Sequence, residues 1–286
     1  MTDIGCVVLT MGNRPELLDR ALQSILSQRG VSVDVVVVGN GWQPTGLPPQ
    51  VRGVGLPRNV GIPAGRNAGV PHVAGELLFF LDDDAALSGD DVLAKGARLL
   101  AERRDIGVVQ LRPVDPVTGR TPRSFVPRLR VGDPARDSDL TALWEGAVLV
   151  RREVLAAAGG WPEVYFYQHE GVELAWRVID EGHRVHYAGD LVCWHDAKQP
   201  GRDPSYFRMQ GRNRVWLARR NLPLPLAAAY LCTWLALTVA RVRGRAALGQ
   251  ALRGWVDGFR EPCGERRPVS WRAAWRMTRA GRPPVI

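Results

Sequence analysis

Cysteine and lysine are both scarce in this sequence of 286 residues. Its four cysteines lie far apart, and none belongs to a C-x-x-C pair, so neither a disulfide framework nor a cysteine zinc site is expected. The cysteine usage instead indicates free thiols in a reducing cytoplasm. Only Lys95 and Lys198 are lysines among the 38 basic residues, and this arginine bias is given little functional weight.

Signals for export and for low-complexity structure are also missing. The first residues, Met1 to Ile4, have neither a basic segment nor a long apolar run, so no secretion signal is expected. No internal repeat is visible. A content of 45% hydrophobic and 23% charged residues excludes a disordered tail or a collagen-like chain. The length suits one large α/β domain, or such a domain with an appendage.

The net charge of +9 is distributed unevenly along the chain. Residues 1–201 hold 21 basic and 25 acidic residues, a net charge of −4, whereas residues 202–286 hold 17 basic and 4 acidic residues, a net charge of +13. A near-neutral body is thus followed by a strongly basic segment. Such a segment favours phosphate, which nucleic acid or anionic lipid could provide.

Short apolar runs alternate with helical patterns over the first two hundred residues. The pattern predicts strands at 4–10, 33–38, 51–54, 76–81, 106–111, 146–150, 183–187 and 191–194. It predicts helices at 14–28 (capped by Asn13), 63–73, 89–101 (capped by Ser88), 152–158 and 170–181, with a long loop over 112–139. The fold class expected is α/β, with a mostly parallel, Rossmann-like sheet covered on both faces by helices.

Ligands of such sheets bind beyond the carboxyl ends of the strands. In this sequence those ends carry the loops 10–14 and 39–42 and the triplet Asp82-Asp83-Asp84. The three loops should converge on one crevice. Three adjacent carboxylates resist joint ionisation, and a divalent cation removes that cost. Oxygen ligands suit Mg²⁺ or Mn²⁺, although a solvated turn or a helix-capping cluster would produce the same triplet.

Other candidate residues are weaker when taken singly. The glycine-rich segment 59–69 could present backbone amides and Arg66 to a phosphate, or it could be an ordinary loop. His195 follows an apolar strand, where a histidine is often a core or rim residue. Glu170 begins a helix, where the helix dipole already favours an acidic residue.

Taken together, these segments resemble the inverting family 2 glycosyltransferases of bacteria, which have the GT-A fold, from residue 4 to about residue 221. The resemblance rests on the order and spacing of Val7-Val8-Leu9-Thr10, Asn13-Arg14-Pro15, 35–41, 59–69, Phe80-Leu81-Asp82-Asp83-Asp84, Gly160-Trp161, 170–177 and Arg212-Asn213-Arg214. It implies inverting transfer of a sugar, of the hexosyl or deoxyhexosyl class, from a nucleotide-diphosphate donor to an acceptor hydroxyl.

The resemblance also assigns roles to residues. The aspartate triplet becomes the Asp-X-Asp element, in which Asp82 and Asp84 would hold Mn²⁺ or Mg²⁺ and Asp82 and Asp83 would contact the donor. His195 would supply a further contact to the metal or the diphosphate. The donor pocket would be lined by Thr10, Asn13, Arg14, Asn40, Asn59 and Arg66.

Two positions depart from the family pattern. Many relatives have Glu-Asp where this chain has Glu170-Gly171, and that aspartate is commonly the proposed base. Because Gly171 cannot accept a proton, Glu170 is the first candidate base, Glu173 the second and His169 the third. Relatives also often have an aspartate where this chain has Gly39, and the amide of the next residue, Asn40, could compensate.

The basic segment contains an uncharged stretch at 221–240, flanked by arginines on both sides. Its length could span a bilayer, but its two early prolines and its flanking arginines favour a helix in the membrane interface, with Tyr230 and Trp234 near the headgroups. A helix packed on the body is the other alternative. The predicted division is a catalytic domain at 1–220 and a basic amphipathic tail at 221–286, attached peripherally to the inner face of the cell membrane.

That location suits an acceptor in cell-envelope or lipid-linked glycan synthesis. A rival from another class is a non-enzymatic module that binds phosphate or nucleic acid, but no nucleic-acid-binding motif is visible and we expect no nucleic-acid partner. A nucleotidyltransferase would need a basic glycine-rich loop after Thr10, which is missing. The two departures also leave open an inactive homologue of the glycosyltransferases.

Overall fold

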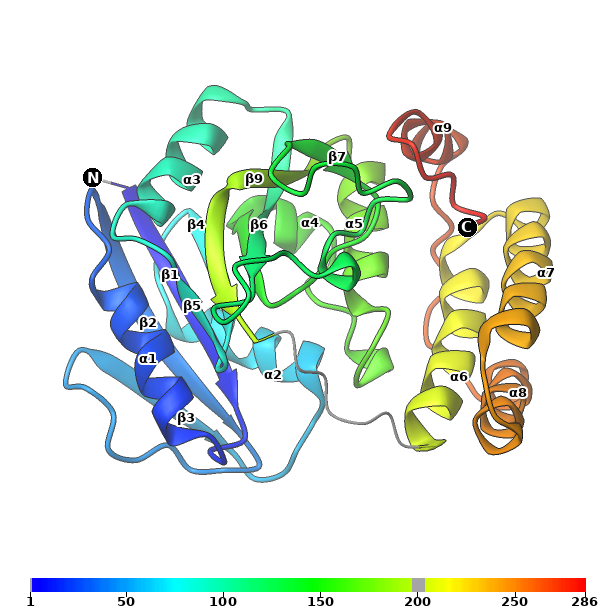
Figure 1. The fold of residues 1–286 in the computed structure, drawn as a ribbon, viewed down its shortest axis with the longest axis horizontal. Coiled ribbons are helices and arrows are strands. Elements are labelled where there is room, and N and C mark those ends of the chain that lie inside the picture. The colour runs from blue at the N-terminus through cyan, green and yellow to red at the C-terminus, as the bar shows by residue number, and fades with distance from the viewer. Residues whose placement is uncertain (1, 197–203) are drawn as a thin grey trace.

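A nine-stranded sheet forms the centre of the computed structural model, which describes residues 2–196 and 204–286 (Figure 1). The order is β3-β2-β1-β4-β8-β6-β9-β5, and β7 also pairs with β9. The strands are β1 (Thr2–Thr10), β2 (Val31–Asn40), β3 (Val51–Leu56), β4 (Leu77–Asp82), β5 (Ala85–Leu87), β6 (Ile106–Val114), β7 (Ser138–Leu140), β8 (Ala147–Arg151) and β9 (Arg184–His195).

Most strands run in one direction, as the alternating pattern predicts. The neighbours β3, β2, β1 and β4 are parallel, and β6 and β9 run the same way. The antiparallel strand β8 separates these two groups, and β5 and β7 are antiparallel to β9. The carboxyl ends of β1, β2 and β4 therefore lie at the same edge of the sheet.

Helices cover both faces of this sheet, which confirms the expected α/β class. The helices of the body are α1 (Pro15–Leu26), α2 (Ile62–Gly69), α3 (Val92–Glu102), α4 (Arg152–Ala157) and α5 (Glu170–Asp180). One core contains Val8 of β1 with Leu22 of α1 and Leu93 of α3. The other contains the adjacent Val7 with Leu174 of α5. Alternate residues of β1 thus contribute to two cores, as the period of a strand requires.

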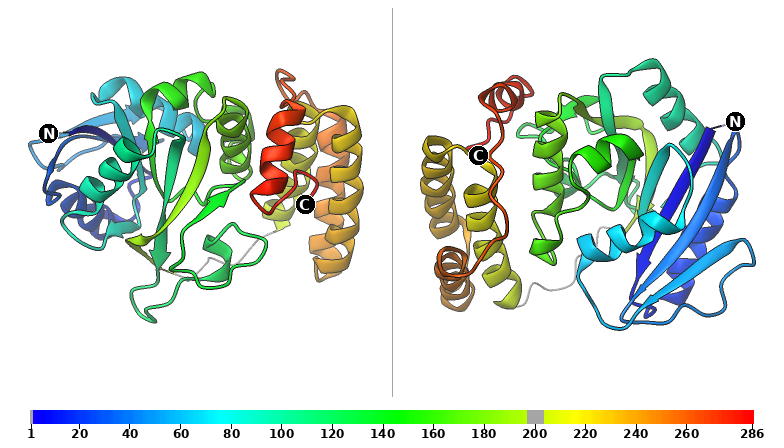
Figure 2. Two further views of the ribbon diagram at one scale, coloured as in Figure 1. Left: turned by 90° about the horizontal axis from the view of Figure 1, so that it is seen from above. Right: turned by 180° about the vertical axis from the view of Figure 1, so that it is seen from behind.

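Four further helices form a layer beside α5: α6 (Pro204–Asn221), α7 (Leu224–Arg241), α8 (Arg245–Arg260) and α9 (Trp271–Arg279) (Figure 2). Trp216, Tyr230 and Met277 from this layer belong to the same buried cluster as the α5 face of the sheet. Helix α6 packs along α8, although the predicted domain boundary at 220/221 separates the two in sequence. That boundary stays a prediction.

Helix α7 is the one helix in the described ranges that is long and apolar enough to cross a membrane by length and composition. The expectation that Tyr230 and Trp234 lie at headgroup level is wrong. Tyr230 is buried against Trp176, and the Arg214 guanidinium lies 3.8 Å from the Trp234 ring centroid. Both aromatic rings therefore face the body, and the outer face of α7 contains Leu224, Leu235 and Val239.

Candidate active site

A cavity of about 400 Å³ opens where β1, β2 and β4 end. It is lined by nine of the ten residues predicted to bind donor or metal: Thr10, Asn13, Arg14, Asn40, Asn59, Asp82, Asp83, Asp84 and His195. Parallel strands bring the three predicted loops to this edge, while β9, which pairs with β5, carries His195 to the same place. The predicted crevice is confirmed as a structural feature.

Each aspartate of the triplet faces a cationic side chain. Arg66 donates to Asp82 Oδ1 at 2.7 Å, and Arg14 donates to Asp83 Oδ1 at 2.6 Å. Arg14 also bonds to Asp84, whose other oxygen lies 3.3 Å from His195 Nε2. The cost of gathering three carboxylates is thus offset by two arginines and an imidazole.

The ionisation of the triplet is uneven because its members are buried among different partners. Burial raises the pKa of Asp83 to about 6, although Thr10 donates to its Oδ2 at 2.5 Å. Burial also opposes ionisation of Asp84, but hydrogen bonds and charges from His195 and Arg14 outweigh it and lower the pKa of Asp84 to about 2. For His195, burial lowers the pKa, and Asp84 outweighs this effect and raises it.

Asp82, Asp84 and His195 fit a divalent cation. One potential ligand atom from each of these residues lies within 4.8 Å of those of the other two. His195 Nε2 lies 3.3 Å from Asp84 Oδ1, so this imidazole nitrogen and that carboxylate oxygen are close enough to share one ion. Two carboxylates and an imidazole are a donor set that Mn²⁺ accepts readily.

Two of the asparagines that line the pocket, Asn40 and Asn59, hold the loop 59–61. Asn40 donates to Asn59 Oδ1 at 2.9 Å and to the Gly61 carbonyl at 3.2 Å, and it accepts from the Val60 amide at 2.8 Å. The Gly61 amide donates to Asn59 Oδ1 at 2.9 Å. The Asn40 amide is therefore engaged by the protein itself, while its side chain lines the cavity.

Arg66 is the one residue of the predicted donor pocket that does not line the cavity. Its side chain is buried, lies against Trp161, and donates to Asp82 and to the Glu145 carbonyl at 3.1 Å. Arg66 thus orients Asp82, and its buried side chain is not exposed to a phosphate in the cavity.

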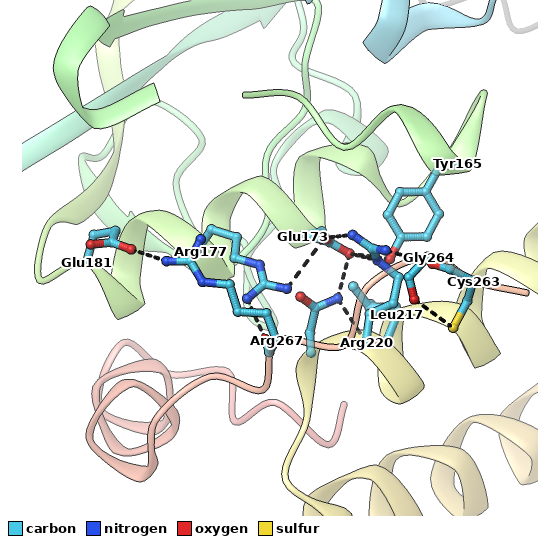
Figure 3. Close-up of polar contacts among 10 residues, drawn as sticks. Tyr165, Glu173, Arg177, Glu181, Leu217, Arg220, Cys263, Gly264 and Arg267 are labelled. Atoms are coloured by element: carbon cyan, nitrogen blue, oxygen red, sulfur yellow. Dashed lines mark hydrogen bonds and ion pairs between the residues drawn. The ribbon is translucent and has the colours of Figure 1, made fainter. Parts of the chain in front are cut away.

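Glu173 does not line the pocket and lies instead beside Tyr165 and Arg220 (Figure 3). Its carboxylate accepts from Tyr165 at 2.5 Å, from Arg220 at 2.8 and 3.0 Å, and from Asn221 at 2.5 Å. Burial opposes its ionisation, but Arg220 outweighs burial and lowers the pKa of Glu173. All its contacts are structural, so the structure offers no route by which the second candidate base could reach a substrate in the pocket.

The other two candidate bases, His169 and Glu170, lie at the start of α5 and do not line this cavity. Glu170 is 2% exposed, its Oε2 has no hydrogen-bond partner among the described residues, and burial raises its pKa to about 8 with a contribution from Glu145. Burial, followed by the charges of Arg214 and Arg282, holds the pKa of His169 well below its usual range. At neutral pH, Glu170 is therefore mainly protonated and His169 neutral.

Several residues near the pocket were not predicted. Phe166, Tyr167 and Met209 line the cavity, and Phe166 has a left-handed backbone (φ 64°), as do Gln168 and His169. Such strain is often concentrated at functional sites. Glu145 does not line the cavity, but its charge and that of Glu170 help to raise the pKa of Tyr167, after burial and Tyr206. In the sequence, the adjacent aromatic residues Phe166 and Tyr167 were the feature that could have indicated this part of the pocket.

The fold is that of the GT-A glycosyltransferases. A model of the family "Glycosyl transferase family 2" matches residues 6–158, more than half of the chain, and the chain belongs to this family. It is also 33% identical over 159 residues to the "Succinoglycan biosynthesis protein ExoO" of Rhizobium meliloti. That match covers 51% of this chain and 43% of the relative, so it spans less than half of the relative's length.

Two solved structures show the same fold at low sequence identity. The mannosyltransferase PcManGT from Pyrobaculum calidifontis, in complex with GDP-Man and Mn²⁺, has a TM-score of 0.59 and 17% identity, covering 90% of this chain and 86% of its own. S. aureus TarS 1–349, in complex with UDP-GlcNAc, has a TM-score of 0.60 and 14% identity, covering 96% and 83%.

Proposed function

We propose that this protein is an inverting, metal-dependent glycosyltransferase that moves a hexosyl or deoxyhexosyl group from a nucleotide-diphosphate donor to an acceptor hydroxyl. The observation that carries the proposal is the convergence of nine predicted donor and metal residues on one cavity. The nucleotide sugars in the two similar structures support this class of donor.

Asp82, Asp84 and His195 would hold Mn²⁺ or Mg²⁺, which stabilises negative charge on a departing diphosphate. The residues of this chain would position the donor. Arg14, half-exposed between Asp83 and Asp84, places a positive charge at the mouth of the pocket. Asn40 and Asn59 shape the wall where the loop 59–61 turns, on the side proposed for the nucleoside.

The acceptor is proposed to belong to cell-envelope or lipid-linked glycan synthesis. The similarity to a succinoglycan biosynthesis protein supports a role in polysaccharide synthesis. The exposed apolar face of α7, followed by exposed Arg241, Arg243 and Arg245, supports peripheral attachment at the cytoplasmic face of the cell membrane.

The test is a screen of the purified protein against UDP-, GDP- and dTDP-sugars with Mn²⁺, measuring release of the nucleoside diphosphate. Asp84→Ala should abolish release and remove the Mn²⁺-dependent thermal stabilisation by the nucleoside diphosphate. Asp90→Ala, a surface aspartate away from the pocket, is the control and should behave like wild type. A wild-type protein that neither binds nor cleaves any of these donors would favour the non-enzymatic module or an inactive homologue.

A further inference from the structure

A carboxylate from another part of the chain fills the space beside Gly171. The Gly171 amide donates to Glu145 Oε1 at 2.9 Å. A β-carbon on Gly171 would overlap that same oxygen. Gly171 lies in the first turn of α5 and does not have a positive φ, so its backbone would accept any residue. The atoms that a side chain at position 171 would meet are those of the Glu145 carboxyl group, which would have to move to make room.

We propose that Glu145 is the base that accepts the proton of the acceptor hydroxyl, in place of the acidic side chain that Gly171 lacks. This inference rests on the glycosyl transfer proposed above. It replaces Glu170 as the first candidate, and it explains how a chain with glycine at this position could retain activity.

The loop before β8 holds Glu145 in place from three sides. The Asp82 amide donates to the Gly146 carbonyl at 2.9 Å, which ties the loop to the aspartate triplet. The Leu143 amide donates to the Gly171 carbonyl at 3.3 Å, which ties it to α5. Arg66 of α2 bonds both Asp82 and the Glu145 carbonyl. The Glu145 carboxyl group therefore lies against the first turn of α5, on a loop that is bonded to Asp82 and Arg66.

Glu145 and Glu170 have different surroundings, and these favour Glu145. Glu145 Oε1 accepts a hydrogen bond from the Gly171 amide, whereas Glu170 Oε2 has no hydrogen-bond partner among the described residues. The Gly171 amide and the N-terminus of α5 stabilise the ionised form of Glu145. Burial nevertheless raises the pKa of Glu145, while Arg66 opposes the rise and Asp82 adds to it. A carboxylate with a raised pKa is a better proton acceptor.

The proposed step is balanced without any further reactant. The acceptor oxygen forms a bond to the anomeric carbon of the donor as its proton moves to the Glu145 carboxylate. The bond from the anomeric carbon to the phosphate oxygen breaks, and its electron pair leaves with the nucleoside diphosphate. The proton on Glu145 is then released to solvent.

The decisive experiment moves the carboxylate back to position 171. With the donor of highest turnover, Glu145→Gln should reduce transfer about 100-fold or more, a loss typical of a missing general base. Glu170→Gln should reduce it far less. Glu145→Ala should be equally impaired, and the double variant Glu145→Ala/Gly171→Asp should recover at least about tenfold, because the alanine frees the space that Gly171→Asp needs.

Binding and stability measurements separate this inference from the proposed function. Glu145→Gln should bind the nucleoside diphosphate with Mn²⁺ as wild type does, measured by thermal shift. Gly171→Asp alone should lower the melting temperature, and Glu145→Ala should relieve that loss. Wild-type turnover in Glu145→Gln, or no recovery in a folded double variant, would overturn the inference but leave the glycosyltransferase intact. Failure of the wild-type protein to bind any donor would instead overturn the proposed function.

Discussion

At the scale of single residues, Gly39 and Gly171 are the two departures from the family pattern, and the absence of a side chain at both has the same structural explanation. At each position, other atoms of the protein already occupy the space of a side chain. A β-carbon on Gly39 would overlap the Trp42 carbonyl, and one on Gly171 would overlap Glu145. An aspartate at position 39 is thus incompatible with the turn that follows β2, and Asn40 cannot simply replace it, because its amide holds the loop 59–61.

Gly39→Asp should therefore destabilise the protein and should not strengthen donor binding. Forcing a side chain against a backbone carbonyl costs about 1–3 kcal/mol of the free energy of unfolding. Urea denaturation measures that loss. Gly89→Asp is the matched control, since the nearest atoms to its β-carbon lie at 3.8 Å or more, and it should be close to neutral. Tighter donor binding by a stable Gly39→Asp protein would contradict this interpretation of the turn.

Whether a site residue can be predicted from the sequence depends on the element that carries it. Thr10, Asn40 and Asp82 lie at the ends of parallel strands, so their convergence follows from topology alone. Glu145 lies in the loop before the antiparallel strand β8, and Tyr167 lies in a strained loop. Met209 lies in α6, the first helix of the C-terminal layer. No periodic pattern indicates where such segments pack, so the sequence does not predict their position.

At the scale of elements, sequence patterns located the long buried strands better than the ends of helices. The predicted Asn13 cap is wrong: Arg14 is the N-cap of α1 and makes no capping bond through its side chain, which binds Asp83 and Asp84 instead. Helix α3 begins at Val92 with Asp91 as its N-cap, so the predicted start at residue 89 and the predicted Ser88 cap are wrong, and residues 85–87 form a strand, β5, that was not predicted. The two strands predicted at 183–187 and 191–194 form one continuous strand, β9.

A buried carboxylate, that of Glu173, links α5 to the C-terminal layer. Glu173→Gln should lower the free energy of unfolding by about 3–5 kcal/mol, because Arg220 and Arg177 would keep their buried charges without a counter-ion. Glu181→Gln, at the opposite end of the same helix, is the control. Its bond to Arg267 is solvent-exposed, and its loss should cost at most about 1 kcal/mol. Equal effects of both variants in urea denaturation would show that the Glu173 cluster does not hold the layer.

The same carboxylate predicts how stability depends on pH. The folded-state pKa of Glu173 is lowered from its ordinary value of 4.5, so its contribution to stability is fully present above pH 4.5. That contribution is lost as the pH falls through the lower, folded-state pKa. The difference in free energy of unfolding between wild type and Glu173→Gln should therefore shrink as the pH is lowered from 7 to 3. A difference that is constant over this range would show that Glu173 is not ionised in the folded protein.

At the scale of the whole molecule, the excess of arginine in the C-terminal layer has two uses. Many arginines crosslink the fold: Arg219 donates to the carbonyls of Gly258 and Glu261, and Arg276 donates to those of Ile179 and Gly182. These side chains are engaged by protein, so net charge alone overstates how much of the layer can bind phosphate. The exposed arginines that follow α7 are the better candidates for contact with anionic lipid.

Membrane attachment should accordingly depend on the outer face of α7. Leu235 and Val239 are 40% and 53% exposed, and no charged residue interrupts that face before Arg241. Leu235→Ser/Val239→Ser should weaken binding to vesicles of anionic phospholipid about tenfold or more, since burying a few apolar groups supplies most of the affinity of an interfacial helix. Vesicle co-sedimentation measures the change without removing a layer that carries part of the core.

The control substitutes exposed apolar residues of the catalytic body, Val117→Ser/Leu129→Ser, and should bind vesicles as wild type does. Replacing Arg241, Arg243 and Arg245 by glutamine should remove the preference for anionic over neutral vesicles, because lipid charge attracts basic residues close to the surface at about 1 kcal/mol each. If the wild-type protein binds neither anionic nor neutral vesicles, the apolar face of α7 does not bind membranes. Any attachment to the membrane would then have to come from elsewhere in the chain.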